Sequence, residues 1–252
     1  MNNSESFDPA AFGHDDLPDA SDVTHEHPDV TGGWLRPAVF GAMDGLVSNF
    51  ALIAGVAGGT SGSDTSPIVL AGLAGLAAGA FSMAAGEYTS VASQSEFAEA
   101  QIEIERDEIA HNEAGEMREL AATYVARGMS QSVALQAAAE VHQDTENAVR
   151  VHAREEFGVV ADELASPTLA AGSSFVAFAL GALIPLLPYL LGASQLLPAV
   201  LLSMVGLFAC GAAVTTVTQR SWMFGGARQL VLGGVSAGLT YLIGSAVGMG
   251  LS

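Results

Sequence analysis

The feature that most constrains this chain is a series of five apolar stretches, each close to the length of a helix that crosses a lipid bilayer. The stretches cover residues 39–57, 68–89, 169–191, 196–217 and 230–251. An α-helix needs about 20 apolar residues to cross the hydrocarbon core. A water-soluble protein can bury one such helix, but this chain has too little other sequence to surround five of them. We therefore predict an all-α, polytopic membrane protein with five transmembrane helices.

Small residues recur within these stretches at intervals of three or four positions. Gly41 and Gly45 form one such pair, and Gly244 and Gly248 form another. Glycine lets two helix backbones approach closely in lipid, where van der Waals packing replaces the hydrophobic effect. The pattern predicts close helix–helix packing at these positions.

Charge divides the chain into very apolar and very acidic parts. The formal net charge is −19, and of the 27 acidic residues eight lie in residues 1–30 and sixteen in residues 96–163. Only Asp44, Asp64 and Glu87 lie elsewhere. This division predicts four parts. They are a disordered acidic cytoplasmic tail (1–33), transmembrane helices one and two (34–95), a helical cytoplasmic domain (96–163) and transmembrane helices three to five (164–252).

The arginines predict the orientation of the chain in the membrane. They precede the first span, lie between spans two and three, or lie between spans four and five: Arg36, Arg106, Arg118, Arg127, Arg150, Arg154, Arg220 and Arg228. The connections GGTSGSDTSP and LLGASQLLP contain none. Basic residues stay on the cytoplasmic side of a membrane. We expect the N-terminus and the acidic domain to be cytoplasmic and the C-terminus to lie outside.

Composition also excludes several classes of function. The chain has no lysine and no cluster of positive charge, so no nucleic-acid partner is expected. Cys210 is the only cysteine, which excludes a disulfide framework or a cysteine metal site within one chain. The N-terminus does not resemble a cleaved signal peptide, and no phosphate-binding G-x-x-x-x-G-K-[ST] motif is present. We predict a protein that is not an enzyme and has no catalytic residues.

The acidic domain between spans two and three shows apolar residues at helical spacing in three stretches, EFAEAQIEIERDEIA, GEMRELAATYVARGM and SVALQAAAEVHQDTENAVRVHAREEFGV. Gly128 and Gly158 are the expected stops. No helix breaker lies between Tyr88 and Glu108, so the first helix is expected to continue out of span two. The pattern predicts a three-helix insert.

The first two spans contain two acids, Asp44 and Glu87, at comparable depths. No lysine or arginine lies within any predicted span, so neither acid has an obvious ion-pair partner, and a proton or a cation is left to neutralise it. The other polar or soft side chains nearby are Ser48, Asn49, Ser82, Met83 and Tyr88. Met83 lies one turn before Glu87 and offers a thioether to a transition metal. The competing interpretations are a packing contact for Met83 and an interfacial, hydrated position for Glu87.

In the cytoplasmic domain, acids are paired at helical spacing. Glu105 and Glu108 are three residues apart, Glu116 and Glu119 are three apart, and His152 and Glu156 are four apart. Each pair shares one face of a helix, so three helices are able to direct oxygen ligands and one imidazole at a common centre. The competing interpretation is that glutamate-rich helices produce such pairs by chance. Glu108-Ile-Ala-His111 matches half of a ferritin-like di-iron site, but no second Glu-x-x-His exists.

These residues carry a resemblance to the vacuolar iron transporter family, as a bacterial-type member whose final two spans are similar to those of bacterial members. The stretches LRPAVFGAMDGLVSNFALIAGVAGG, AGAFSMAAGEYTSVASQSE, FALGALIPLLPYLL and TQRSWMFGGARQLVLGG are similar to its membrane spans, and the resemblance covers about residues 34–252. It implies a homodimer of five-span subunits that moves Fe²⁺, often also Mn²⁺, out of the cytosol in exchange for protons. Asp44 and Met83 would line the path at the dimer interface.

The resemblance further implies that the insert is a metal-binding domain, and it favours ligands over chance for the paired glutamates. The implied ligands are Glu105, Glu108, Glu116, Glu119 and Glu156. Where the plant pattern has a Met-Met pair, this chain has His152 and Ala153. Histidine can replace methionine as a ligand, whereas alanine cannot.

Together these observations predict a proton-coupled antiporter that exports Fe²⁺ across a cell membrane of bacterial type. The predicted transport path is Asp44, Ser48, Asn49, Met83, Glu87 and Tyr88, and the predicted metal ligands are Glu105, Glu108, Glu116, Glu119, His152 and Glu156. The ion is cargo, and no resident cofactor is expected. The alternatives are the same transporter serving Mn²⁺, a membrane-anchored iron sensor or store without transport, and a channel.

Overall fold

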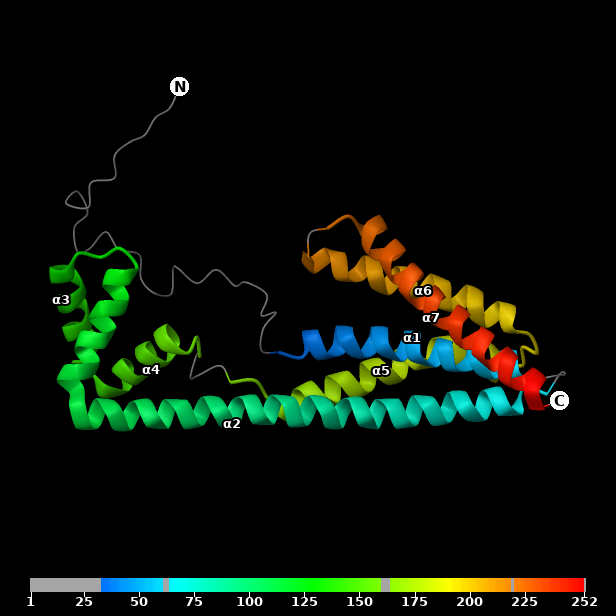
Figure 1. Ribbon diagram of the computed structural model, residues 1–252, viewed down its shortest axis with the longest axis horizontal. Helices are drawn as coiled ribbons and strands as arrows, with labels where there is room; N and C mark the ends of the chain where they lie inside the picture. Colours follow the sequence, from blue (N-terminus) through cyan, green and yellow to red (C-terminus); the bar gives the residue numbers. More distant parts are fainter. Residues whose placement is uncertain (1–32, 61–63, 160–163, 219, 252) are drawn as a thin grey trace, which may run out of the picture. The chain divides into compact units, whose positions relative to one another are not determined.

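The computed structural model describes residues 33–60, 64–159, 164–218 and 220–251, and within these ranges every regular element is a helix. The helices are α1 (Leu35–Gly59), α2 (Ser66–Ala126), α3 (Gln131–Val141), α4 (Thr145–Glu156), α5 (Pro167–Leu190), α6 (Leu196–Thr218) and α7 (Trp222–Leu251), drawn in Figure 1. The all-α prediction is confirmed for this part of the chain. The acidic tail predicted over 1–33 lies, except for Gly33, outside the described residues.

Five of these helices, α1, α2, α5, α6 and α7, are long and apolar enough to cross a membrane. Each covers one of the five predicted spans, so the predicted polytopic architecture is confirmed. Large apolar side chains on them are exposed: Leu70 is 71% exposed and Val205 is 67% exposed. Apolar surface of this extent is unfavourable in water and ordinary where lipid tails surround a helix.

Two membrane helices extend beyond their predicted limits and contain an arginine. α1 begins at Leu35 and includes Arg36, and α7 begins at Trp222 and includes Arg228. The prediction followed apolar composition, whereas the helices begin about one turn (α1) and two turns (α7) before the predicted apolar stretches. Arginine tolerates such a position because its long stem lies along apolar surface while its guanidinium reaches polar surroundings.

α1 lies at the centre of the membrane helices and contacts α2, α5, α6 and α7. Leu46, Phe50 and Ile53 of α1 are at most 2% exposed and form its packed core. The predicted glycines lie at two of its contacts. A Cβ atom on Gly41 would lie 2.7 Å from the carbonyl oxygen of Ser174 in α5, and one on Gly248 would lie 2.6 Å from that of Gly59. Both distances are too short for any other residue.

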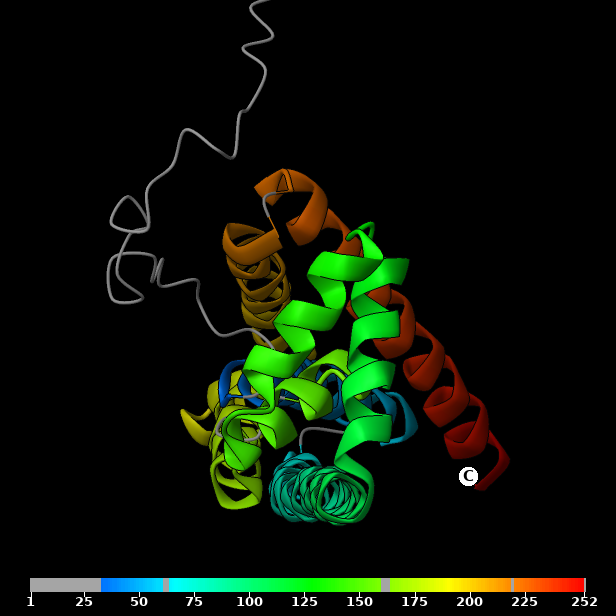
Figure 2. The same ribbon diagram turned by 90° about the vertical axis from the view of Figure 1, so that its left-hand side faces the viewer.

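The insert consists of the second half of α2 together with α3 and α4, which contact one another. The predicted continuation of span two into the insert is confirmed, since α2 is 61 residues long. It is kinked at Asn112, whose backbone angles (φ −145°, ψ 48°) are not helical. Figure 2 shows the insert, in green, as a small bundle seen from its end.

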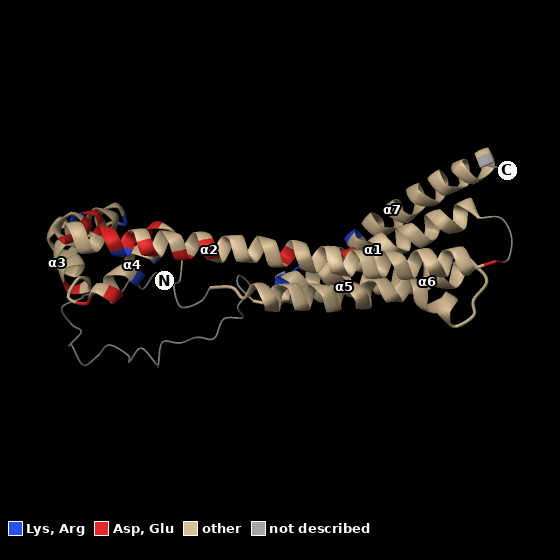
Figure 3. Ribbon diagram, turned by 90° about the horizontal axis from the view of Figure 1, so that it is seen from below, with Lys and Arg blue, Asp and Glu red and all other residues tan. Residues whose placement is uncertain are grey.

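The third predicted stretch of the insert is divided into α3 and α4. Asp144 is the N-cap of α4: its carboxylate accepts hydrogen bonds from the backbone N–H groups of Glu146 and Asn147, at 2.9 and 3.2 Å. Gly128 and Gly158, the predicted stops, follow α2 and α4 with positive φ angles of 102° and 67°. These angles strain any residue with a Cβ atom. Figure 3 shows that acidic residues gather in the insert and are sparse along the membrane helices.

Candidate metal centre and intramembrane pocket

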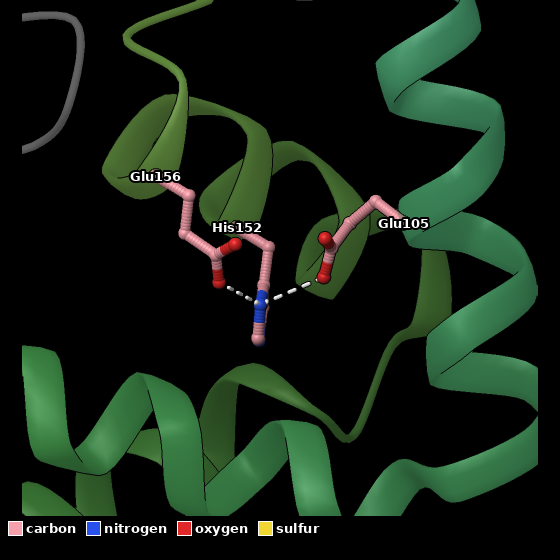
Figure 4. Close-up of side chains that lie close together, drawn as sticks. All are labelled: Glu105, His152 and Glu156. Atoms are coloured by element: carbon pink, nitrogen blue, oxygen red, sulfur yellow. Dashed lines mark hydrogen bonds and ion pairs between the residues drawn. The ribbon is translucent and has the colours of Figure 1, made fainter.

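Three predicted ligands converge at one point of the insert, as Figure 4 shows. His152 Nδ1 lies 2.8 Å from Glu105 Oε1 and 3.0 Å from Glu156 Oε1. The side chains of His152 and Glu105 are 0% and 1% exposed, and that of Glu156 is 23% exposed. A buried imidazole therefore lies between one buried and one partly buried carboxylate.

The local sequence explains this convergence. His152 and Glu156 are four residues apart on α4 and share a face, and Glu105 lies on α2 beyond its membrane-spanning part. Ile109 of α2 packs with Ala148 and Val149 of α4, which fixes the two helices against each other. An ion pair between Arg106 Nη2 and Glu146 Oε2, at 3.2 Å, joins the same helices.

The cluster places several carboxylates close together in a buried site. Burial, followed by the nearby carboxylates of Glu156, Glu116, Glu108 and Glu119, raises the pKa of Glu105 to about 7. Burial is also the largest cause of the raised pKa values of Glu116 and Glu156, to which neighbouring glutamates add. The structure therefore brings all five predicted glutamates within electrostatic range of one another. Burial, followed by the neighbouring His142, lowers the pKa of His152.

The geometry suits a divalent cation. When a metal ion binds two ligand atoms at right angles, each about 2.1 Å away, the two ligand atoms are about 3 Å apart. This separation is close to the distances from His152 Nδ1 to Glu105 Oε1 and to Glu156 Oε1, 2.8 and 3.0 Å. The nitrogen carries at most one proton, and only its contact with Glu156 has hydrogen-bond geometry. Glu105 Oε1 is buried and accepts no hydrogen bond from the described residues. A proton or a metal ion is needed to neutralise it.

A second histidine, which the sequence did not single out, adjoins this cluster. His142 follows α3 directly and is 6% exposed. Its ring contacts that of His152 edge to face, with centroids 5.2 Å apart. Nothing in the local sequence distinguishes His142 from an ordinary polar residue at a helix end, so only the packing of α3 on α2 and α4 reveals its position.

A pocket of about 460 Å³ lies between α1 and α2, with Phe178 of α5 also in its wall. Five of the six predicted path residues line it: Asp44, Ser48, Asn49, Met83 and Glu87. Tyr88 does not line the pocket and is 48% exposed. Ser82, Ser90 and Arg36 are further lining residues. The pocket thus joins acids, hydroxyl groups, an amide and a thioether within the membrane-spanning part.

Small residues make room for this pocket. Gly75, Gly79 and Gly86 of α2 line it; Gly75 faces Leu52 and Asn49 of α1, and Gly79 faces Phe178 of α5. Asn49 is 2% exposed, and its Nδ2 donates a hydrogen bond of 2.6 Å to the carbonyl oxygen of Ala182. Its Oδ1 is buried and accepts no hydrogen bond from the described residues. Ser48 donates to the backbone oxygen of Asp44 at 2.6 Å.

The prediction that Glu87 lacks an ion-pair partner is wrong. Arg36 Nη1 lies 4.0 Å from Glu87 Oε2, with side chains 67% and 10% exposed. The reason is that α1 begins before its apolar stretch, so its first turn lies beside the pocket. At this distance and exposure the pair is weak. For Asp44, the described ranges contain no ion pair.

Comparison with known proteins gives a consistent result. The sequence model of the VIT family matches residues 35–245. The chain is 37% identical to a vacuolar iron transporter of Acanthamoeba castellanii over 209 residues, 80% of this chain and 71% of that protein. It is 32% identical to vacuolar iron transporter homolog 1 of Arabidopsis thaliana over 224 residues, 84% of each chain. Vacuolar iron transporter homolog 1 of Oryza sativa subsp. japonica is 32% identical over 222 residues, 86% of this chain and 75% of that protein. This multi-pass membrane protein therefore belongs to the VIT family.

Proposed function

We propose that this protein is a proton-coupled antiporter that exports Fe²⁺ from the cytosol. The observation that carries the proposal is the pocket between α1 and α2, which is lined by Asp44, Met83 and Glu87. The names of the similar proteins, vacuolar iron transporters, support iron as the cargo. The arginine distribution supports a cytoplasmic N-terminus and insert and an external C-terminus.

The insert collects the ion. Its paired glutamates and His152 supply oxygen and nitrogen ligands, and their negative field raises the concentration of divalent cations around them. Glu87 and Glu105 lie on the same helix, 18 residues apart, which corresponds to about 27 Å along the axis. The ion covers this distance in solution before it enters the pocket.

The pocket binds the ion during passage. Asp44 and Glu87 supply carboxylate oxygens, Met83 supplies a thioether, and Asn49 and Ser48 supply neutral polar groups. A soft sulfur ligand favours a transition metal over Mg²⁺ or Ca²⁺. An arriving cation displaces Arg36 from Glu87, because both positive charges compete for one carboxylate.

Protons supply the energy by competing for the same oxygens. A carboxylate in a low-dielectric site binds a proton more readily than one in water, so a proton that arrives from outside releases the metal. The sequence contains no nucleotide-binding G-x-x-x-x-G-K-[ST] motif that would couple transport to ATP. The energy then comes from the proton gradient.

A second copy of the chain completes the assembly in this proposal. Two apolar side chains of α1 in the wall of the pocket, Phe40 and Leu52, are 58% and 38% exposed. A homodimer that buries these side chains would enclose the pocket between subunits and double its acidic ligands. Lipid covers the outward faces of α6 and α7.

The test is flux in proteoliposomes that contain a Fe²⁺-sensitive dye and a pH-sensitive dye. Asp44→Asn removes the charge and keeps the shape, so we expect Fe²⁺ flux and its coupled proton flux to disappear. Asp64→Asn is the matched control, since Asp64 lies outside the pocket, between α1 and α2. Unchanged flux in Asp44→Asn would refute the mechanism.

The same vesicles separate the alternatives. Competition between Fe²⁺ and Mn²⁺ measures which ion is preferred. Metal flux without proton flux would indicate a channel. Metal binding by the protein without any flux would indicate a sensor or store, in which Asp44→Asn alters no metal-dependent property.

A further inference from the structure

One row of side chains on α1 lines two successive pockets in the membrane-spanning part. Residues at every fourth position of a helix form such a row. The row consists of Arg36, Phe40, Asp44, Ser48, Leu52, Val56 and Thr60. Its first five members line the pocket between α1 and α2. Its last three line a second pocket of about 460 Å³, between α1 and α7. Among the described residues, Leu52 alone lines both of these pockets.

The chemistry of the row changes at Leu52. The first pocket contains the carboxylates of Asp44 and Glu87, whereas the described lining of the second contains no charged side chain. The hydroxyl groups of the second pocket are bonded to backbone. Thr60 Oγ1 donates to the carbonyl oxygen of Val56 at 3.0 Å, and Thr240 Oγ1 donates to that of Ala51 at 2.7 Å. The charged ligands for a cation thus end before Leu52.

Leu52 also lies at the end of the first pocket. A Cβ atom on Gly75 of α2 would lie 2.5 Å from Leu52 Cδ2, so this side chain packs directly against the α2 backbone. Gly75 is the lining residue of α2 nearest to the beginning of that helix. Arg36 and Ser90 line the opposite end of the pocket, and both are exposed. The pocket is therefore accessible beside Arg36 and bounded by apolar contact at Leu52.

We propose that Leu52 is the hydrophobic barrier of the transport path. An ion bound at Asp44 meets this side chain eight residues, or about 12 Å, further along α1. A hydrophobic constriction excludes water and therefore blocks ions. The inference deepens the proposed function, on which it rests for its effect on transport. A barrier beyond Asp44 keeps the metal at the carboxylate with which protons compete, so that it does not leak past Leu52 without proton exchange.

The experiment measures which positions a charged, membrane-impermeant methanethiosulfonate reaches from each side of sealed proteoliposomes. The background is the full chain with Cys210→Ala, because Cys210 is its only cysteine. Ser90→Cys and Thr60→Cys replace exposed residues of the first and the second pocket, so their labelling identifies the two sides.

The test positions are Ser48→Cys and Val56→Cys, four residues before and four residues after Leu52. Reagent on the side that labels Ser90→Cys should also label Ser48→Cys, and it should not label Val56→Cys. Addition of Leu52→Ala should raise the labelling rate of Val56→Cys from this side by about tenfold or more, because the constriction then becomes wide enough to hold water.

The matched control is Leu187→Ala. Leu187 of α5 is 38% exposed, as is Leu52, and it lines neither pocket. With Leu187→Ala, Val56→Cys should stay unlabelled from the Ser90 side. An equal labelling rate of Val56→Cys with Leu52→Ala and with Leu187→Ala would overturn the proposal. Labelling of Val56→Cys from that side while Leu52 is in place would also overturn it, and this measurement needs no substitution of Leu52.

Metal flux distinguishes this inference from the transport mechanism. In the dye-loaded vesicles, Leu52→Ala should let Fe²⁺ pass without coupled protons. If Asp44→Asn retains full Fe²⁺ flux while Leu52→Ala opens Val56→Cys to the reagent, the antiport mechanism fails and the barrier stands. If Asp44→Asn abolishes flux while Leu52→Ala leaves the ratio of protons to Fe²⁺ unchanged, the mechanism stands and the barrier fails.

Discussion

Replacing Glu105 with glutamine should stabilise the metal-free insert above pH 7. The pKa of Glu105 is raised from 4.5 to about 7, chiefly because its carboxylate is buried. Each pKa unit corresponds to about 1.4 kcal/mol, so ionised Glu105 costs the folded insert about 3 kcal/mol. Because the folded pKa exceeds the unfolded one, this cost is absent below pH 4.5, grows between pH 4.5 and 7, and is complete above pH 7.

The measurement is hydrogen–deuterium exchange of the metal-free full chain, read at the backbone amides of α4 and corrected for intrinsic exchange rates. At pH 8, Glu105→Gln should slow exchange in α4 by up to about a hundredfold, which corresponds to the full cost. At pH 4.5 the variant and the unchanged chain should be equal. Glu99→Gln is the control, because Glu99 lies on the same helix and is exposed.

With metal present, the unchanged chain should exchange more slowly in α4 than Glu105→Gln does. The unchanged chain gains the binding energy of the ion in its folded state, and Glu105→Gln loses part of it. Two results would refute this reasoning. One is unchanged exchange of α4 in metal-free Glu105→Gln at pH 8, and the other is an equal effect of the substitution at pH 4.5 and pH 8.

Two further substitutions test parts of the structure that position these sites. Arg36→Gln should lower the KM for Fe²⁺ by up to about fivefold at low salt, because an exposed ion pair of about 1 kcal/mol or less no longer competes for Glu87. Initial flux rates measure this, and an increased KM would contradict it. Asp144→Ala should destabilise α4 by about 1 kcal/mol through loss of its N-cap. Hydrogen exchange in α4 measures this effect, and exchange as slow as in the unchanged chain would show that the cap contributes nothing.

The membrane helices were predictable because length and apolar composition alone decide whether a helix can cross a bilayer. Their ends were not predictable from the same signal. Arg36 and Arg228 interrupt the apolar composition but not the helical hydrogen bonds, so α1 and α7 begin earlier than the apolar stretches do. The missed ion pair between Arg36 and Glu87 follows directly from this difference.

In the insert, sequence spacing predicted which residues share a helix face, and it did not predict how the faces meet. The break between α3 and α4 has a local signal in Asp144, but the helical pattern of apolar residues runs across it. The kink at Asn112 lies between two of the predicted helical stretches, but the position of His142 beside His152 depends on tertiary packing. No single-helix periodicity contains such information.

The length of α2 limits how the insert can act on transport. Asn112 is its only described residue with non-helical backbone angles, and it lies beyond Glu105, so the segment from Glu87 to Glu105 is regular helix. A regular helix does not shorten, and its 18-residue separation keeps those carboxylates about 27 Å apart along the axis. Direct transfer of an ion between ligands needs separations of a few ångströms, so the insert cannot pass metal to the pocket by contact along this helix. In the proposed mechanism the insert acts on the local concentration of the ion, and therefore on KM, whereas Asp44 and Met83 act on the passage itself, and therefore on the maximal rate.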